Sequence, residues 1–144
     1  VWVDIHEWGG IYLDHGESGG VVGYPGKTRS DIRREFPGCI LPDDVTDRGW
    51  WNGGREGRSA CERRAIRVAD RLRGWAGSSQ NVALVTHGDF VSFLLRALLG
   101  QLSSNGCYYR HSNTGITRID FEADGRLSVY YMNRTEHFVP ELGS

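Results

Sequence analysis

The apolar run from Asn81 to Thr86, followed at once by His87-Gly88, constrains the fold more than any other stretch of the sequence. The run comes after a Gly/Ser turn and lacks polar alternation, which is typical of a strand buried on both faces of a parallel sheet. An apolar helix is expected next, from Phe90 to Leu99, where Gly100 ends it. This order predicts an α/β chain with a mainly parallel sheet and helices on both faces.

A long amphipathic helix is predicted before this run. Apolar residues recur every three or four positions from Ala65 to Trp75, and Ser59 with Glu62 has the spacing of a capping box. The helix carries many arginines. We expect them, Arg64 included, to face water rather than to form an anion-binding surface.

Three further segments have clear local signals. A short helix is predicted at about 29–36, because Thr28 to Asp31 has capping-box spacing and Pro37-Gly38 stops the pattern. Residues 115–121 and 127–133 alternate in period two around an Asp-Gly turn, which predicts a β-hairpin. Residues 1–27 are rich in glycine and predict short strands or loops.

Length and charge limit the classes of protein that this chain can represent. Its 144 residues suit a single domain, residues 1–144. With 17 basic and 18 acidic residues and no run of either sign, we expect no nucleic acid and no membrane as partner. Three cysteines without ligand spacing favour free thiols in a reducing compartment, hence a cytoplasmic protein without structural zinc.

The first residues, Val1 to Asp4, lie in what the pattern predicts to be an ordered segment, without an initiating methionine. The only methionine is Met132. We therefore expect a fragment whose N-terminal part is absent.

His87 is the main candidate for chemistry. A histidine at the carboxyl end of a buried strand, just before a helix, lies where ligands bind in open α/β sheets. The free N–H groups and dipole of the helix N-terminus attract anions, phosphate above all. The alternative is a structural histidine near a strand end, and these residues alone leave both interpretations open.

Two stretches resemble the C-terminal half of the histidine phosphatase superfamily, the phosphoglycerate-mutase-like proteins: NVALVTHGDFVSFLLRALLG and HSNTGITRIDFEADGRLSVYYMNRTEHF. In that family a strand ends in Ser/Thr-His-Gly, and a later Asn-x-x-Ile strand pairs with one that ends near Asn and His. Thr86 to Gly88, Asn113 to Ile116, and Asn133 with His137 match these features. Upstream, DIHEWGGIY resembles the acidic segment of the family. The resemblance implies its three-layer α/β fold, N-terminally truncated.

The resemblance also implies a phosphohistidine mechanism. In the family a first histidine, in Arg-His-Gly, takes the phosphoryl group and yields it to water or another acceptor. His87 matches the second histidine, which donates hydrogen bonds to the phosphoryl oxygens. Gly88 and Asn113 are expected to contact the small phosphorylated substrate. An acid protonates the leaving alcohol, and Glu7 is the candidate, with Asp4 as the alternative. No metal and no organic cofactor are implied.

The sequence Asp14-His15-Gly16 looks like the nucleophile motif but does not fit it. A carboxylate in place of the arginine repels a phosphate dianion, and His15 follows Glu7, whereas the family has the nucleophile first. We therefore expect His15 to be exposed in a Gly-rich loop and the nucleophile to lie upstream of Val1. These 144 residues alone are then expected to be inactive as a phosphatase.

Two other functions stay open on this evidence. One is a catalytically inactive anion-binding module of the same fold. The other is an unrelated α/β hydrolase with His87 as a base, which requires a Ser or Cys within hydrogen-bond reach. Cys61 and Arg67 have the bare spacing of a cysteine phosphatase, but they fall in a highly charged helix instead of a Gly-rich anion loop. The spacing of His6-Glu7, His111 and His137 requires no metal.

Overall fold

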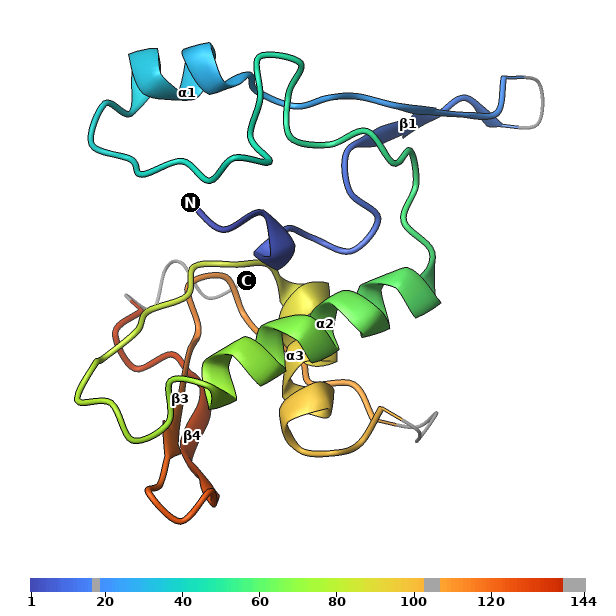
Figure 1. Ribbon diagram of the computed structural model, residues 1–144. Helices are drawn as coiled ribbons and strands as arrows, with labels where there is room; N and C mark the ends of the chain where they lie inside the picture. Colours follow the sequence, from blue (N-terminus) through green and yellow to red (C-terminus); the bar gives the residue numbers. More distant parts are fainter. Residues whose placement is uncertain (17–18, 103–106, 139–144) are drawn as a thin grey trace.

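The computed structural model of the chain describes residues 1–16, 19–102 and 107–138. Figure 1 shows the N-terminal segment lying between two groups of elements, with β1 and α1 on one side and α2, α3, β3 and β4 on the other. The elements in chain order are η1 (Val3–Ile5), β1 (Tyr12–Asp14), β2 (Val21–Gly23), α1 (Arg29–Glu35), α2 (Arg58–Arg73), α3 (Gly88–Leu98), β3 (Ile116–Phe121) and β4 (Leu127–Arg134).

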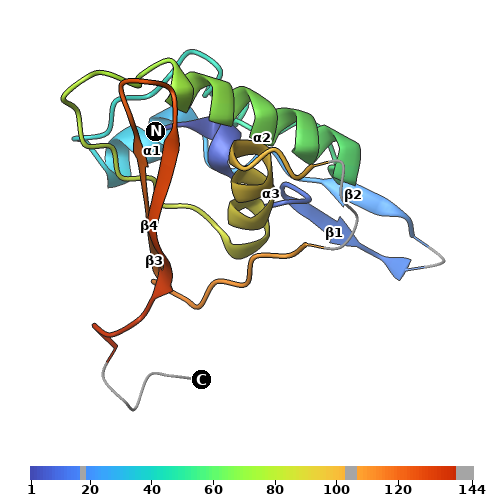
Figure 2. The ribbon, with the colours of Figure 1, turned by 90° about the horizontal axis from the view of Figure 1, so that it is seen from below.

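The core lies between α2 and α3, and the predicted amphipathic pattern is confirmed there. Apolar side chains spaced by three and four residues on α2 pack against the apolar helix α3. Separately, no helix in the described ranges is both long enough and apolar enough to span a bilayer. Three residues of the β3–β4 hairpin pack onto this core from one side of α3 (Figure 2). The buried core cluster comprises Cys61, Ala65, Val68, Ala69, Leu72, Phe90, Phe93, Leu94, Ala97 and Leu98.

The ends of α2 differ from the sequence prediction. Its N-cap is Gly57 and makes no side-chain cap, so the capping box expected from Ser59 and Glu62 is wrong. Glu62 instead pairs with Arg58 one turn earlier, at 3.0 Å. The helix stops at Arg73, so Trp75 lies beyond its end.

The capping box predicted for α1 is confirmed. Thr28 Oγ1 accepts the Asp31 N–H at 3.1 Å, and Asp31 Oδ2 accepts the Thr28 N–H at 3.2 Å. Hydrogen bonds from the Thr28 hydroxyl and from Arg34 lower the pKa of Asp31 to about 2. The carboxylate form that closes the cap is therefore favoured at all but the most acidic pH.

Both sheets are antiparallel pairs. β1 pairs with β2, with Tyr12 opposite Gly23. β3 pairs with β4 and confirms the predicted hairpin, in which Gly125 takes the positive φ of 84° that its turn requires.

Residues 81–86 depart from the prediction of a strand buried in a parallel sheet. They are extended but belong to no strand, and Val85 is 90% exposed. Within the described residues both sheets are antiparallel, and no described segment supplies backbone partners beside this run. The expected burial on both faces is therefore wrong for this chain, because a strand is buried only where neighbours cover it.

Candidate functional site

His87 is the N-cap residue of α3. Its backbone is extended (φ −121°, ψ 157°), and its carbonyl accepts the N–H of Val91 at 2.9 Å. The imidazole is exposed and makes no hydrogen bond to another residue in the described part of the chain. Caps of this kind usually carry an oxygen that accepts an N–H two or three residues on, and His87 does not use its side chain in this way. Its ring is therefore free to meet a ligand at the helix N-terminus.

Glu7 supplies the missing cap from a distant part of the sequence. Its Oε1 accepts the N–H of Phe90, the third residue of α3, at 3.1 Å and the N–H of Trp8 at 2.7 Å. The structure thus places Glu7 and His87, two residues predicted from the sequence, at the same helix end.

Hydrogen bonds hold the segment that carries Glu7 against α2 and against Thr86, the residue before His87. The hydroxyl of Thr86 donates to the carbonyl of Ile5 at 2.5 Å. Arg64 of α2 is only 3% exposed and donates to the carbonyls of residues 4, 6 and 7. Its ion pair with Glu56, at 2.6 Å, is buried as well.

The expectation that the arginines of α2 face water is confirmed for Arg63, Arg67, Arg71 and Arg73, which are exposed, but is wrong for Arg64. Arg64 lies three residues after the buried Cys61 and next to Ala65, in phase with the apolar stripe. On a helical wheel Arg64 therefore falls on the apolar face, and this position indicates that it is buried. A charged residue on that face requires a buried partner. The sequence does not reveal that Glu56 is that partner.

The Asp4 carboxylate, the alternative acid, pairs with Arg67 at 2.9 Å. This ion pair points the side chain to the outer surface of α2, where Arg67 is exposed. Glu7, not Asp4, is therefore the acidic side chain that reaches the N-terminus of α3.

His6 is a structural histidine. Its Nδ1 lies 2.8 Å from the carbonyl of Val3, and its ring is 5.3 Å from Trp50 and 4.8 Å from Trp51 between ring centroids. Burial lowers the pKa of His6 from 6.5, so the neutral ring is favoured.

His111 and His137 contact residues in or just before β3. His111 Nε2 is 2.6 Å from the Thr117 hydroxyl, and His137 Nε2 is 3.1 Å from the Thr114 carbonyl. Across residues 1–16, 19–102 and 107–138, no three His, Cys, Asp or Glu side chains gather as metal ligands.

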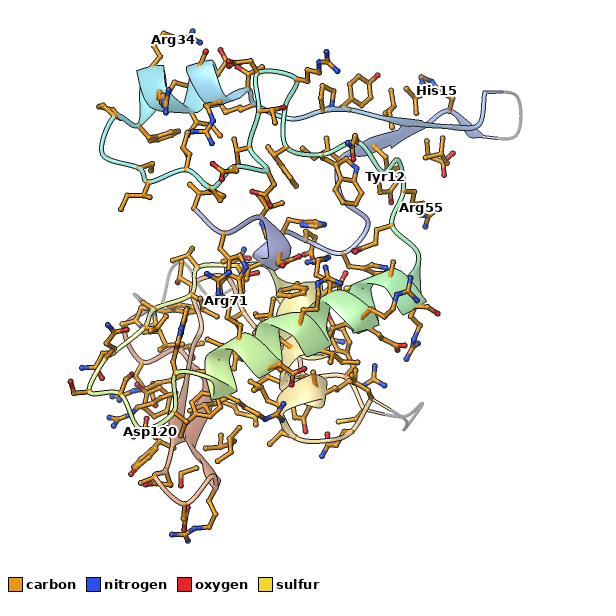
Figure 3. All side chains as sticks on the ribbon, in the orientation of Figure 1. Tyr12, His15, Arg34, Arg55, Arg71 and Asp120 are labelled. Carbon is orange, nitrogen blue, oxygen red and sulfur yellow. The ribbon has the colours of Figure 1, made fainter. Side chains whose placement is uncertain are left out.

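His15 is exposed, as predicted, and lies along the β1–β2 ribbon away from α3 (Figure 3). Its neighbour Asp14 accepts the N–H of Gly16 at 3.0 Å, so the carboxylate serves a local turn. The turn explains the Asp-His-Gly sequence without a phosphate site.

The two predicted substrate contacts, Gly88 and Asn113, differ in their relation to His87. Gly88 is the first residue of α3 and lies beside His87. Asn113 is exposed in the turn before β3 and makes no hydrogen bond to His87, Gly88 or Glu7 within the described residues. A different asparagine organises that turn, because Asn133 Oδ1 accepts the Ser112 N–H at 2.8 Å.

The Cys61 thiol is unsuited to nucleophilic chemistry. It is fully buried, and burial raises its pKa to about 12. The structure therefore agrees with the rejection of a cysteine phosphatase site at Cys61 and Arg67.

A small cavity of about 190 Å³ adjoins the first turns of α3. Trp8 packs edge-on against Phe93 with ring centroids 5.5 Å apart, and the Tyr108 hydroxyl donates to Asp89 at 2.6 Å. Trp8 follows Glu7 and Asp89 follows His87 by two residues in the sequence, but neither Glu7 nor His87 is among the residues that line the cavity. Its lining comprises Trp8, Arg58, Asp89, Ser92, Phe93, Arg96, Cys107 and Tyr108.

Comparison with known proteins gives one match. A family model described as histidine phosphatase superfamily (branch 1) matches residues 21–134, more than half of the chain. The match includes His87, Gly88 and Asn113, whereas Glu7 lies before it. No curated protein and no solved structure matches the chain.

Proposed function

Because the chain belongs to the histidine phosphatase superfamily, we propose that its protein hydrolyses or transfers the phosphoryl group of a small phosphomonoester through a phosphohistidine. The observation that supports this most directly is the exposed imidazole of His87 at the N-terminus of α3, beside the carboxylate of Glu7. A phosphate at this position would meet an imidazole donor and the positive end of a helix dipole.

In this proposal His87 donates hydrogen bonds to the phosphoryl oxygens. Its ring has no capping role, because Glu7 accepts the N–H of Phe90 in its place. The backbone of Gly88 allows close approach of the phosphate at the first turn of α3. Fixed donors of this kind stabilise the charge that develops in the transition state. Asn113 is proposed as a further substrate contact, on the family resemblance alone.

Glu7 is proposed as the acid that protonates the leaving alcohol. Its Oε1 is held by two backbone N–H groups, while its Oε2 makes no hydrogen bond to another described residue. The oxygen Oε2 is therefore the one available to carry a proton toward the substrate.

The nucleophile is proposed to come from a segment outside these residues, because Arg-His-Gly does not occur in the 144-residue sequence. We propose that the same segment adds a strand beside residues 81–86, whose backbone has no described partner, and so completes a mainly parallel sheet. A strand there would end close to His87, where the nucleophile must act.

The lack of Arg-His-Gly in this sequence also favours a second candidate, a module that binds phosphate without turnover. The third candidate, a hydrolase with His87 as base, lacks support, because no described Ser hydroxyl or Cys thiol lies within hydrogen-bond reach of the ring.

The test uses the protein made from the complete reading frame and a panel of phosphomonoesters. His87→Ala should lower kcat/KM by about 10²–10³-fold, while the exposed His15→Ala serves as control and should leave it unchanged. Acid-labile radiolabel retained after turnover of a ³²P-phosphomonoester would identify the phosphohistidine. Activity that does not depend on His87 would contradict the proposal, and phosphate binding without turnover would identify the binding module.

A further inference from the structure

Arg64 uses every donor of its guanidinium within the protein. Nε and Nη2 donate to the two carboxylate oxygens of Glu56 at 2.9 and 2.6 Å. Nη1 donates to the carbonyls of Asp4 and His6, both at 2.8 Å, and Nη2 also lies 3.4 Å from the carbonyl of Glu7. A guanidinium has five N–H donors, so none remains for a phosphate.

The same guanidinium also contacts α3. Its central carbon lies 4.3 Å from the centroid of the Phe90 ring, a close cation–π contact. Phe90 is the residue whose N–H donates to the Glu7 carboxylate at 3.1 Å. Arg64 thus contacts both partners of the Glu7–Phe90 hydrogen bond. It binds the backbone of the segment that carries Glu7, and it packs on the ring of Phe90.

We infer that Arg64, held by Glu56, is a positioning residue that sets the Glu7 carboxylate against the N-terminus of α3. The inference rests on the proposed role of Glu7 as the acid. Because Glu56 neutralises the guanidinium and occupies one side of its fork, the other side is directed at the carbonyls of residues 4 and 6. A lysine keeps the charge but has no planar fork, so it cannot hold these acceptors together.

The choice of substrate separates positioning from a merely structural role. An alkyl phosphate needs its leaving alcohol protonated, whereas 4-nitrophenyl phosphate releases a stable anion and does not. A misplacement of about 1 Å can cost up to about 10²-fold in rate, so Arg64→Lys should lower kcat/KM on the alkyl phosphate by about 10- to 100-fold. The rate on 4-nitrophenyl phosphate should be largely retained, as it should be for Glu7→Gln.

The matched control is Arg63→Lys, because Arg63 is the exposed neighbour on the same helix. It should leave both rates unchanged. Glu56→Gln is the second variant, for use where Arg64→Lys does not fold. It keeps the shape of Glu56 and one of its two accepting oxygens, but removes the charge and replaces the other oxygen with an amide donor. It should show the same split between substrates.

A nuclear magnetic resonance measurement tests the geometry without activity. In the 144-residue chain, the Phe90 amide proton should show the downfield chemical shift of an N–H that donates to a charged oxygen, because its acceptor is Glu7. The shift should persist in Arg63→Lys and disappear in Glu7→Gln, Arg64→Lys and, in part, Glu56→Gln.

The two readouts separate failure of this inference from failure of the proposed function. Equal losses on both substrates, or a Phe90 amide that keeps its downfield chemical shift in Arg64→Lys, would overturn the positioning role. A wild-type protein without phosphatase activity, but with the expected amide pattern, would refute the proposed function and leave the positioning of Glu7 established.

Discussion

The exposure of Val85 predicts that replacing it with threonine will change the stability of the 144-residue chain very little. The side chain is 90% exposed. Full burial of a valine contributes about 1.5–3 kcal/mol, and a tenth of that is about 0.2–0.3 kcal/mol. We therefore expect Val85→Thr, which keeps the shape of the side chain, to lower the free energy of unfolding by less than about 0.5 kcal/mol.

Val68→Thr makes the same chemical change inside the core. Val68 is fully buried between α2 and α3. A hydroxyl placed there is removed from water and should lower the free energy of unfolding by about 1–3 kcal/mol. The loss in free energy of unfolding is therefore expected to be several-fold larger for Val68→Thr than for Val85→Thr.

Urea titrations followed by far-ultraviolet circular dichroism give both free energies, with the slope m checked for constancy across the variants. A loss of more than about 1 kcal/mol in Val85→Thr would refute the reasoning, because it would mean that residues 81–86 are covered. If an upstream strand covers this run in the complete protein, Val85→Thr should become costly there while Val68→Thr stays the same.

Three further predictions concern single side chains. Because the pKa of His6 lies below 6.5 in the folded chain, the unfolded chain takes up this proton first, so the free energy of unfolding should fall as pH drops below 6.5; His6→Gln should reduce that slope in urea titrations. Iodoacetamide should modify the exposed Cys39 and spare the buried Cys61 until the chain unfolds, as peptide mass spectrometry would show; early labelling of Cys61 would contradict its burial. Thr114 has a φ of 58°, which is unfavourable for a β-branched residue, so Thr114→Asn should raise the free energy of unfolding by up to about 1 kcal/mol; calorimetry showing a loss would count against strain at this position.

The elements set by local patterns could be predicted from the sequence. The apolar spacing of α2 and the continuous apolar run of α3 place both helices within a few residues of their observed ends. The Thr28 to Asp31 capping box and the Asp-Gly turn of the hairpin needed only neighbouring residues as well. Local signals are sufficient where the stabilising contacts are themselves local.

The features set by distant contacts could not be predicted in the same way. The Val82 to Val85 run has the composition of a buried strand, but its burial depends on a neighbouring strand that the described chain does not provide. The resemblance to the family identified Glu7 and His87 as candidates. It did not predict the hydrogen bond that holds Glu7 at α3. That contact joins residues 83 positions apart, Glu7 and Phe90, and no periodic pattern encodes it.

The positions of the tryptophans make intrinsic fluorescence sensitive to one short segment, residues 2–8. Trp2 and Trp8 belong to residues 2–8, and Trp75 lies 6.0 Å from Trp2 between ring centroids. Trp50 and Trp51 flank the ring of His6. All five indoles thus lie in this segment or against it, so its detachment would change the surroundings of each of them, and Trp2, Trp50 and Trp51, which are partly buried, would gain exposure to water. A red shift of intrinsic emission that precedes the loss of helical dichroism would report release of the Glu7 segment while α2 and α3 remain folded.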